Sequence, residues 1–382
     1  MSNNISNTNL IVGCGISGIV LANKIATELN QKVLIIDSKD HIGGNCYDYK
    51  DKETSIYVHK YGTHIFHTDI EEVWNYLSQY TKWYPYQHKV KGLIDGQEVP
   101  IPFNINSIEK LFPQSMANKL IDKLISVFGF NIKVPILELR KQNDEDLKFL
   151  ADFIYEKIFL NYTLKQWGTK PEDLDPSVSG RVPVYISRDD RYFQNKYQII
   201  PLDGYTNMFN KMLDNPLIKI KLNTTYKNFV KYNDVSAFNK IFYTGAIDEY
   251  FDYEFGELPY RSLKFDFLKF KMNYFQSNSV INYPNNYNWT RIGEYKYFLN
   301  QENTNNKTIV SYEYPQEYQK DINDRYYPII KDDNIILYSK YLNKANQLKN
   351  VYFLGRLGDY KYYDMDKAVQ KALDLFKNCN NN

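Results

Sequence analysis

The order of hydrophobic and polar positions near the start of the chain predicts a strand, a helix and a second strand. Residues 10–12 are a short apolar run, and apolar residues then recur at helical spacing over residues 15–30. Residues 32–37 are a second, continuous apolar run that ends in an acid, a pattern typical of a parallel strand buried on both faces. Residues 9–45 are therefore predicted to form one β-α-β unit.

The middle of the chain has mostly helical spacing. Residues 74–160 follow this pattern, and residues 144–168 predict one long amphipathic helix that ends at Gly168. Pro171 and Pro176 then predict a loop, because proline cannot continue a helix.

Beyond the loop the pattern becomes strand-like and aromatic. Short apolar runs that end in glycine, at 240–245 and 351–358, predict further strands of the first sheet. Other runs between residues 181 and 314 predict an antiparallel sheet over a cleft. These runs are 182–187, 218–222, 261–272, 279–284 and 308–315.

Three glycines lie between the first predicted strand and its helix. Gly13, Gly15 and Gly18 have the G-x-G-x-x-G spacing of a dinucleotide-binding turn. In such a turn two glycines let the backbone approach the pyrophosphate, and the third lets the helix pack closely on the strand. Asp37 follows Gly18 by 19 residues and is placed to accept hydrogen bonds from a ribose. The turn, both strands and the acid together predict a bound dinucleotide.

Charge and composition exclude several classes of protein. The 382 residues include 47 basic and 45 acidic side chains, a net charge of +2, which gives no indication of nucleic-acid binding. No apolar run reaches the roughly 18 residues that span a bilayer, so no membrane insertion is predicted. Three cysteines without a C-x-x-C pair favour a reducing, cytoplasmic compartment. Most of the 36 tyrosines are attributed to biased composition rather than to a cleft that stacks on bases.

Two further runs resemble flavoproteins. A second pair of glycines follows the acid, in HIGGN at residues 41–45. With the first glycine motif, this run resembles the large FAD family that includes glutathione reductase and the amine oxidases. VYFLGRLG at residues 351–358 resembles the C-terminal motif with which that family closes around its flavin. The resemblance implies FAD as the bound dinucleotide.

The rest of the chain resembles a more specific group. It contains no second G-x-G-x-x-G and no C-x-x-x-x-C redox pair. Four runs, in the correct order, instead resemble the UDP-galactopyranose mutase family, and the likeness extends from about residue 9 to 375. They are KYGTHIFHT (60–68), YTLKQWG (162–168), GRVPVYISRDDRYF (180–193) and GRLGDYKYYDMD (355–366).

The resemblance implies an α/β fold with a Rossmann-like FAD-binding domain, an inserted helical domain and an antiparallel β-sheet substrate domain. The expected ranges are 1–75, 195–250 and 335–382 for the FAD-binding domain, 76–170 for the helical domain, and 171–194 with 251–334 for the substrate domain. A mobile flap is expected near residues 168–190.

The activity that the resemblance implies is an isomerisation without net oxidation. The family interconverts UDP-galactopyranose and UDP-galactofuranose, and N5 of its reduced flavin attacks the anomeric carbon and displaces UDP. The product supplies galactofuranose for surface glycans. The expected reductant is NAD(P)H or a flavin reductase, and the expected assembly is a homodimer.

The resemblance also assigns roles to individual residues. A departing diphosphate needs permanently charged, bidentate donors, and the resemblance implies that these are Arg181 and Arg291. The implied catalytic residues are Arg181, Arg291, Tyr362, Asp364 and His64. The implied substrate contacts are His88, Phe159, Tyr162, Trp167, Arg181, Tyr192, Asn282, Arg291, Tyr326, Tyr327 and Tyr362. The implied cofactor contacts are Gly13, Gly15, Ser17, Gly18, Asp37, Ser38, Gly44, Asn45, His64, Ile65, Gly355, Arg356, Asp364 and Met365.

The sequence is also compatible with other functions. One is a hydride-transferring flavoenzyme of the amine-oxidase type, and another is a flavin-free binding protein similar to the GDP-dissociation inhibitors. Within the family, the sugar could carry a 2-acetamido group. His59, His64 and His67 include an H-x-x-H spacing, but no Cys or carboxylate cluster completes a coordination set, so no metal is expected.

Overall fold

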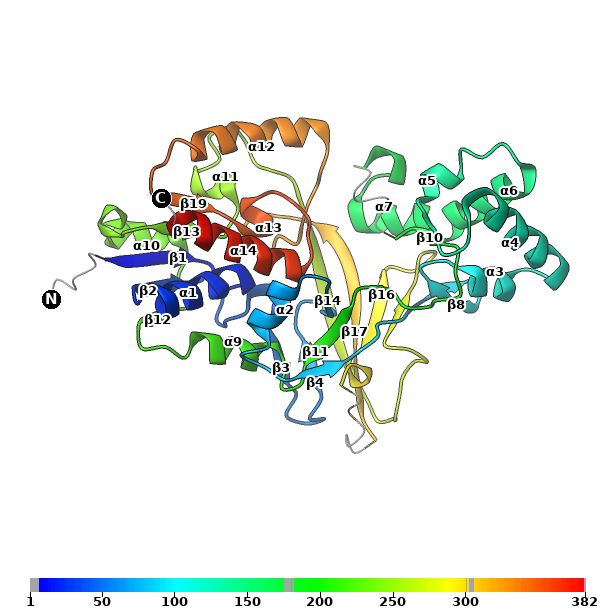
Figure 1. Ribbon diagram of the computed structural model, residues 1–382, viewed down its shortest axis with the longest axis horizontal. Coiled ribbons are helices and arrows are strands. Elements are labelled where there is room, and N and C mark those ends of the chain that lie inside the picture. The colour runs from blue at the N-terminus through cyan, green and yellow to red at the C-terminus, as the bar shows by residue number, and fades with distance from the viewer. Residues whose placement is uncertain (1–6, 175–179, 181, 300, 302–305, 381–382) are drawn as a thin grey trace.

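The computed structural model describes residues 7–174, 180, 182–299, 301 and 306–380. Figure 1 shows a parallel sheet with its helices at one end, a second sheet in the middle, and a group of helices at the other end. Among the described residues, no helix is long and apolar enough to cross a membrane.

The first sheet contains the predicted β-α-β unit. Its five parallel strands have the order β12-β2-β1-β13-β19. Alternate residues of β1 face opposite sides. Ile11 packs with α1 (Ile16–Glu28) and α14 (Met365–Asn380), while Leu10 packs with Phe229 and Phe238 on the other face. Burial on both faces explains the continuous apolar runs and confirms the prediction of a parallel sheet. The strands are β1 (Thr8–Val12), β2 (Lys32–Ile36), β12 (Ile218–Lys221), β13 (Ile241–Tyr243) and β19 (Val351–Phe353).

For one strand of this sheet, the sequence pattern predicted a place in the other sheet. Residues 218–222 were predicted to join the antiparallel sheet, but β12 pairs in parallel with β2 at the edge of the first sheet. Its alternating Ile and Lys residues are typical of a half-exposed strand, and that pattern is the same for either direction of pairing.

The second sheet has seven strands in the order β18-β14-β17-β16-β15-β7-β8. Its pairs are antiparallel except β15 with β7. The strands are β7 (Val90–Ile94), β8 (Gln97–Ile101), β14 (Tyr260–Phe270), β15 (Val280–Asn282), β16 (Arg291–Glu294), β17 (Thr308–Glu317) and β18 (Tyr327–Pro328).

The prediction of helical structure over 74–160 was wrong for β7 and β8, which form a hairpin of this sheet. Asp95 and Gly96 turn the chain with φ of 47° and 80°. Asp-Gly is a strong signal for such a two-residue turn, and the helical interpretation overlooked it.

The helical part carries the predicted helix over 144–168. It runs without interruption through α6 (Glu145–Ile154), a π-helical segment (Tyr155–Leu160) and α7 (Asn161–Trp167), and ends at Gly168 in the left-handed region. The run 182–187 was predicted to join the antiparallel sheet. Its strand β10 (Val184–Tyr185) instead pairs with β9 (Lys133–Val134) beside these helices, because an alternating pattern does not specify its partner.

The remaining strands form two smaller sheets. The strands are β3 (Asp48–Lys50), β4 (Tyr57–His59), β5 (Phe66–Thr68), β6 (Trp83–Pro85) and β11 (Tyr197–Pro201). The helices are α1 (Ile16–Glu28), α2 (Glu71–Leu77), α3 (Ile105–Leu111), α4 (Gln114–Phe128), α5 (Ile136–Leu139), α9 (Tyr205–Leu213), α10 (Tyr226–Tyr232), α11 (Ile247–Tyr250), α12 (Asp332–Ala345), α13 (Gly355–Gly358) and α14 (Met365–Asn380).

Candidate active site

A cavity of about 270 Å³ collects most of the residues singled out by sequence. It lies where α7, the second sheet and the loops around α13 meet. The predicted site residues that line it are Asn45, His64, Ile65, His88, Phe159, Tyr162, Trp167, Tyr192, Asn282, Arg291, Tyr326, Tyr327, Arg356, Tyr362, Asp364 and Met365.

One row of residues across the second sheet lines this cavity. Asn282 on β15 is paired with Gly92 on β7 and with Arg291 on β16, and Arg291 is paired with Glu313 on β17. All four residues line the cavity. Paired residues on neighbouring strands point to the same face, so the sheet holds an amide, a guanidinium and a carboxylate side by side.

Arg291 is the cation of this row. Its Nη2 donates to the Tyr162 hydroxyl at 2.5 Å, and its Nε lies 3.6 Å from Oε1 of Glu313. Burial opposes the charge, yet Glu313 raises the pKa of Arg291 above its ordinary value. The side chain keeps 30% of its surface exposed, and its Nε has no hydrogen-bond partner. Arg291 is therefore a permanent positive charge with donor capacity to spare inside a cavity.

Glu313 was not singled out as a site residue by sequence, although it lies in the predicted strand over residues 308–315. Its side chain is 5% exposed, and its Oε1 has no hydrogen-bond partner. Burial raises the pKa of Glu313, and the Arg291 guanidinium lowers it in part. Nothing local in the sequence marks this glutamate, because only strand pairing places it beside Arg291.

Aromatic residues from the middle of the chain and from its C-terminal part meet on another wall of the cavity. Tyr327 on β18 lies 5.6 Å from Trp167 and 5.5 Å from Tyr362, measured between ring centroids. The Arg356 guanidinium lies 4.7 Å from the centre of the Tyr362 ring, a cation–π contact. Phe159 and Tyr162 line the same cavity from the helical side.

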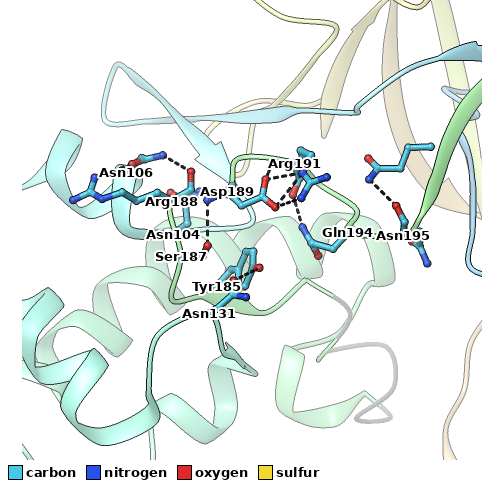
Figure 2. A network of polar contacts seen from close by, with 11 residues as sticks. Asn104, Asn106, Asn131, Tyr185, Ser187, Arg188, Asp189, Arg191, Gln194 and Asn195 are labelled. Atoms are coloured by element: carbon cyan, nitrogen blue, oxygen red, sulfur yellow. Dashed lines mark hydrogen bonds and ion pairs between the residues drawn. The ribbon is translucent and has the colours of Figure 1, made fainter.

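A network of polar contacts surrounds Asp189 and Arg191, just before Tyr192 in the chain (Figure 2 shows the network around the first two). Arg191 donates from Nε and Nη2 to the Asp189 carboxylate at 2.9 and 2.7 Å. The amide of Asn104, the N-cap residue of α3, donates to the carbonyl of Asp189 at 3.3 Å. The Tyr192 N–H donates to the His88 carbonyl at 2.7 Å. The backbone that presents Tyr192 to the cavity is thus fixed to two other segments.

The histidines of the H-x-x-H run have protein partners. His64 Nδ1 lies 2.8 Å from the Gly62 carbonyl, and the His64 N–H donates to Nδ1 of His59 at 2.9 Å. His67 Nδ1 lies 2.9 Å from Oδ1 of Asn195, and its Nε2 lies 3.8 Å from Asp364. Within the described part of the chain, no three His, Cys, Asp or Glu residues are grouped as metal ligands.

Burial of these histidines predicts a loss of stability in acid. It lowers the pKa of His59, His64 and His88 from 6.5 to about 3. Between those values the unfolded chain binds protons that the folded protein does not. The contribution of these histidines to the free energy of unfolding is therefore fully present well above pH 6.5. The free energy of unfolding falls on acidification, by up to about 1.4 kcal/mol per pH unit for each histidine.

Urea unfolding between pH 7.5 and 5 measures this slope. His59→Asn keeps an acceptor for the His64 N–H but cannot titrate, so its unfolding free energy should fall less steeply with decreasing pH than that of the wild type. Equal slopes for the two proteins would show that His59 does not contribute.

The glycine turn has the form expected for a phosphate cradle. A Cβ on Gly18 would lie 2.0 Å from the Gly13 carbonyl oxygen, so only glycine lets α1 pack on β1 here. Helix α1 begins after Gly15 with no side-chain cap and no acidic residue in its first turn. Its N-terminal N–H groups are therefore available to an anion. Ser17 lies buried in this first turn.

The predicted ribose-binding acid lies beside this turn. Asp37 Oδ2 accepts from the Cys14 N–H at 2.6 Å, and its Oδ1 accepts from the Lys39 N–H at 2.8 Å. Each carboxylate oxygen has a second lone pair, so Asp37 keeps acceptor capacity for a hydroxyl. The neighbouring Ser38 is exposed.

The HIGGN loop connects the turn with the cavity. The Gly43 N–H donates to the Cys14 carbonyl at 2.7 Å, and a Cβ on Gly44 would lie 2.9 Å from the Gly15 Cα. The next residue, Asn45, lines the cavity. Gly355 lies at the start of α13, with a φ of 87°. Arg181, expected on the flap, lies outside the described residues.

Comparisons with known proteins agree with this architecture. The sequence profile described as UDP-galactopyranose mutase matches residues 157–362, more than half of the chain, and that of an NAD(P)-binding Rossmann-like domain matches residues 11–80. A crystal structure of reduced UDP-galactopyranose mutase superposes with a TM-score of 0.73 over 97% of this chain and 95% of that one, at 14% identity. A putrescine oxidase superposes with a TM-score of 0.57 over 98% and 99%, at 8% identity. At these identities the likeness shows the fold.

Relatives identified by sequence show the family of the chain as well as its fold. UDP-galactopyranose mutase of Mycoplasma genitalium is 39% identical over 372 residues, covering 94% of this chain and 91% of the relative. dTDP-fucopyranose mutase of Escherichia coli is 36% identical over 371 residues, covering 96% and 97%. These matches confirm the predicted α/β class with its Rossmann-like domain, and they exceed what a shared fold alone would give. The chain belongs to the UDP-galactopyranose mutase family, a family of nucleotide-sugar isomerases.

Proposed function

We propose that this protein binds FAD and interconverts UDP-galactopyranose and UDP-galactofuranose. The observation that supports the proposal most is that one cavity is lined by the helix carrying Phe159 and Tyr162 (the aromatic helix), by the Arg291 row and by Asn45 of the HIGGN loop. A nucleotide sugar and a flavin ring need to meet in one enclosed space, and these three elements offer the contacts that each requires.

The residues present fit FAD. Asp37 would bind the ribose. The uncapped N-terminus of α1, together with Gly15 and Gly44, would bind the pyrophosphate. Asn45, the residue after Gly44, lines the cavity. The flavin-binding residues would be His64, Ile65, Arg356, Asp364 and Met365, which line that cavity. When bound in its reduced form, FAD supplies the nucleophile for the anomeric carbon, so that no net oxidation is needed.

The protein's own groups would bind and orient the nucleotide sugar. Phe159 and Tyr162 offer ring faces to the uracil. Arg291 would face the diphosphate, whose negative charge increases as the anomeric bond breaks. Tyr327 and Tyr362 would donate hydroxyl hydrogen bonds to the phosphates. Burial raises the pKa of Tyr327 and raises that of Tyr162 to about 12, so both phenols keep their protons at neutral pH.

Arg181 is proposed as the second diphosphate ligand, carried by a flap that closes over substrate. Strand β10, which begins at Val184, pairs with β9, and Asn104 donates to the Asp189 carbonyl, so the segment that follows Arg181 is tied to other parts of the protein. We therefore place the end of the moving part before Val184. We also propose a homodimer, and NAD(P)H or a flavin reductase as the source of electrons.

A second substrate has a specific observation in its favour. A full-length relative is described as dTDP-fucopyranose mutase, and its identity to this chain is close to that of the UDP-galactopyranose mutases. dTDP-fucopyranose is therefore the alternative to be tested beside UDP-galactopyranose. UDP-N-acetylgalactosamine is the third sugar to include.

One assay decides between these possibilities. Purified protein should be yellow and should release FAD on denaturation. After reduction with dithionite it should convert UDP-galactofuranose into UDP-galactopyranose, with products separated by HPLC, and the oxidised protein should not. Parallel reactions with dTDP-fucopyranose and UDP-N-acetylgalactosamine identify the sugar. Colourless protein that FAD cannot reconstitute, or equal turnover with oxidised flavin, would refute the proposal.

A further inference from the structure

Lys165 on α7 has an unusual set of partners for a lysine. Its ammonium donates to three main-chain carbonyls of one loop: those of Tyr283 at 2.5 Å, Trp289 at 3.1 Å and Tyr287 at 3.2 Å. An ammonium group has three N–H donors, so these carbonyls match its capacity. Burial lowers the pKa of Lys165 to about 8, so it is mostly charged at neutral pH.

The loop held by Lys165 joins two residues of the candidate site. It covers residues 283–290 and connects Asn282, the last residue of β15, with Arg291, the first residue of β16. Those two residues are cross-strand partners and line the cavity. The loop therefore adjoins Arg291, whose backbone the sheet pairs with Asn282 on one side and Glu313 on the other.

The same helix carries the proposed base-binding ring. Tyr162 lies three residues before Lys165, and its hydroxyl accepts from Arg291 at 2.5 Å. On the side of the sheet, Arg261 of β14 donates to the carbonyls of Gln166 at 2.9 Å and Lys165 at 3.0 Å. A cation at the end of α7 also interacts favourably with the helix dipole. Helix α7, which packs against β17, is thus tied to the sheet by Arg261 and to the loop by Lys165.

We propose that Lys165 is a positioning residue that couples nucleotide binding by α7 to the placement of Arg291. It does so by holding loop 283–290 against the helix, so that the Tyr162 ring and the Arg291 guanidinium belong to one rigid unit. Uracil bound on Tyr162 then has its diphosphate at a fixed distance from the arginine. The inference rests on the proposed function for its ligand, but the contact between lysine and loop does not depend on the identity of the substrate.

Two substitutions at Lys165 test the coupling. Lys165→Met keeps most of the side-chain volume and removes all three donors, whereas Lys165→Arg keeps a cation with several donors. Lys157→Met is the matched control, because Lys157 precedes α7 on the same helical run and its ammonium pairs with Asp95 at the surface.

The first readout needs no ligand. Hydrogen exchange followed by mass spectrometry should show faster exchange of residues 283–290 in Lys165→Met than in wild type, in Lys165→Arg or in Lys157→Met. Because three hydrogen bonds are lost together, we expect at least a tenfold increase in the exchange rate of the loop. An unchanged rate, with the protein folded, would overturn the proposal.

The second readout is a double-mutant cycle on UDP binding by calorimetry. Lys165→Met should weaken UDP binding about tenfold and raise KM more than it lowers kcat, with partial recovery in Lys165→Arg. Arg291→Ala should cost clearly less affinity in the Lys165→Met background than in wild type, because the arginine is already misplaced. Additive losses would show that Lys165 acts independently of Arg291 and would overturn the coupling. Wild-type protein that binds no UDP would refute the proposed function, whereas the exchange experiment would still test the contact.

Discussion

Replacing Arg291 with alanine should lower kcat about a hundredfold or more, with a smaller loss of UDP affinity. The guanidinium lies in a cavity, with its Nε free of hydrogen bonds and a pKa held above the ordinary value. The diphosphate gains negative charge as it departs, so the interaction strengthens toward the transition state and affects kcat more than ground-state binding. Steady-state kinetics with dithionite-reduced protein and calorimetric titration with UDP separate the two effects.

Arg291→Lys and Arg140→Ala are the comparisons for this experiment. Lysine should recover little of the activity, because an ammonium cannot reproduce the planar two-point contact of a guanidinium. Arg140 pairs with Asp152 at the surface, so Arg140→Ala should leave kcat unchanged. If Arg291→Ala, folded and loaded with FAD, retained nearly normal kcat, the proposed diphosphate site would be wrong.

Gly15→Ala should abolish turnover by preventing FAD from binding, while leaving the stability of the apoprotein nearly unchanged. The φ of Gly15 is −83°, which alanine can adopt, and an added Cβ would meet no atom closer than the Gly44 Cα at 3.9 Å. The methyl group would instead occupy space that a pyrophosphate needs for its approach to the backbone. Gly to Ala stabilises by about 0.4–1 kcal/mol through the unfolded chain, but Gly15 is the N-cap of α1, where alanine is less favourable than glycine, so the two effects largely cancel. FAD content by absorbance and urea unfolding of the apoprotein measure both effects.

Gly18→Ala is the contrasting variant. Its Cβ would lie 2.0 Å from the Gly13 carbonyl, so it should destabilise the apoprotein as well as reduce FAD binding. Normal flavin content in folded Gly15→Ala would exclude the turn as the pyrophosphate site.

Short-range patterns predicted the part of the protein in which neighbours in sequence are neighbours in space. The β-α-β unit follows from periodicity over residues 9–45, and the close approach of Gly18 to Gly13 follows from a spacing of five residues. Helix α7 ends at Gly168 as expected, because a glycine there adopts a left-handed conformation at little cost.

Long-range pairing was not predictable in the same way. The Asp-Gly turn at residues 95–96 was a local signal for the β7–β8 hairpin, but no local signal pairs that hairpin with β15, almost 200 residues away in the chain. The parallel pairing of β12 with β2 likewise depends on the crossover that precedes it rather than on the Ile-Lys alternation.

In the candidate site, too, some features follow from the local sequence and others depend on long-range contacts. The sequence by itself determined which residue types are present: the glycine turn with Asp37, the aromatic helix and Arg291. Only the tertiary structure decided that Glu313 lies beside Arg291 and that Lys165 binds loop 283–290, which precedes Arg291 in the chain. The physical reason is that periodicity and local steric limits act over a few residues, whereas strand register and the burial of a charge are set by partners that are brought together only when the chain folds.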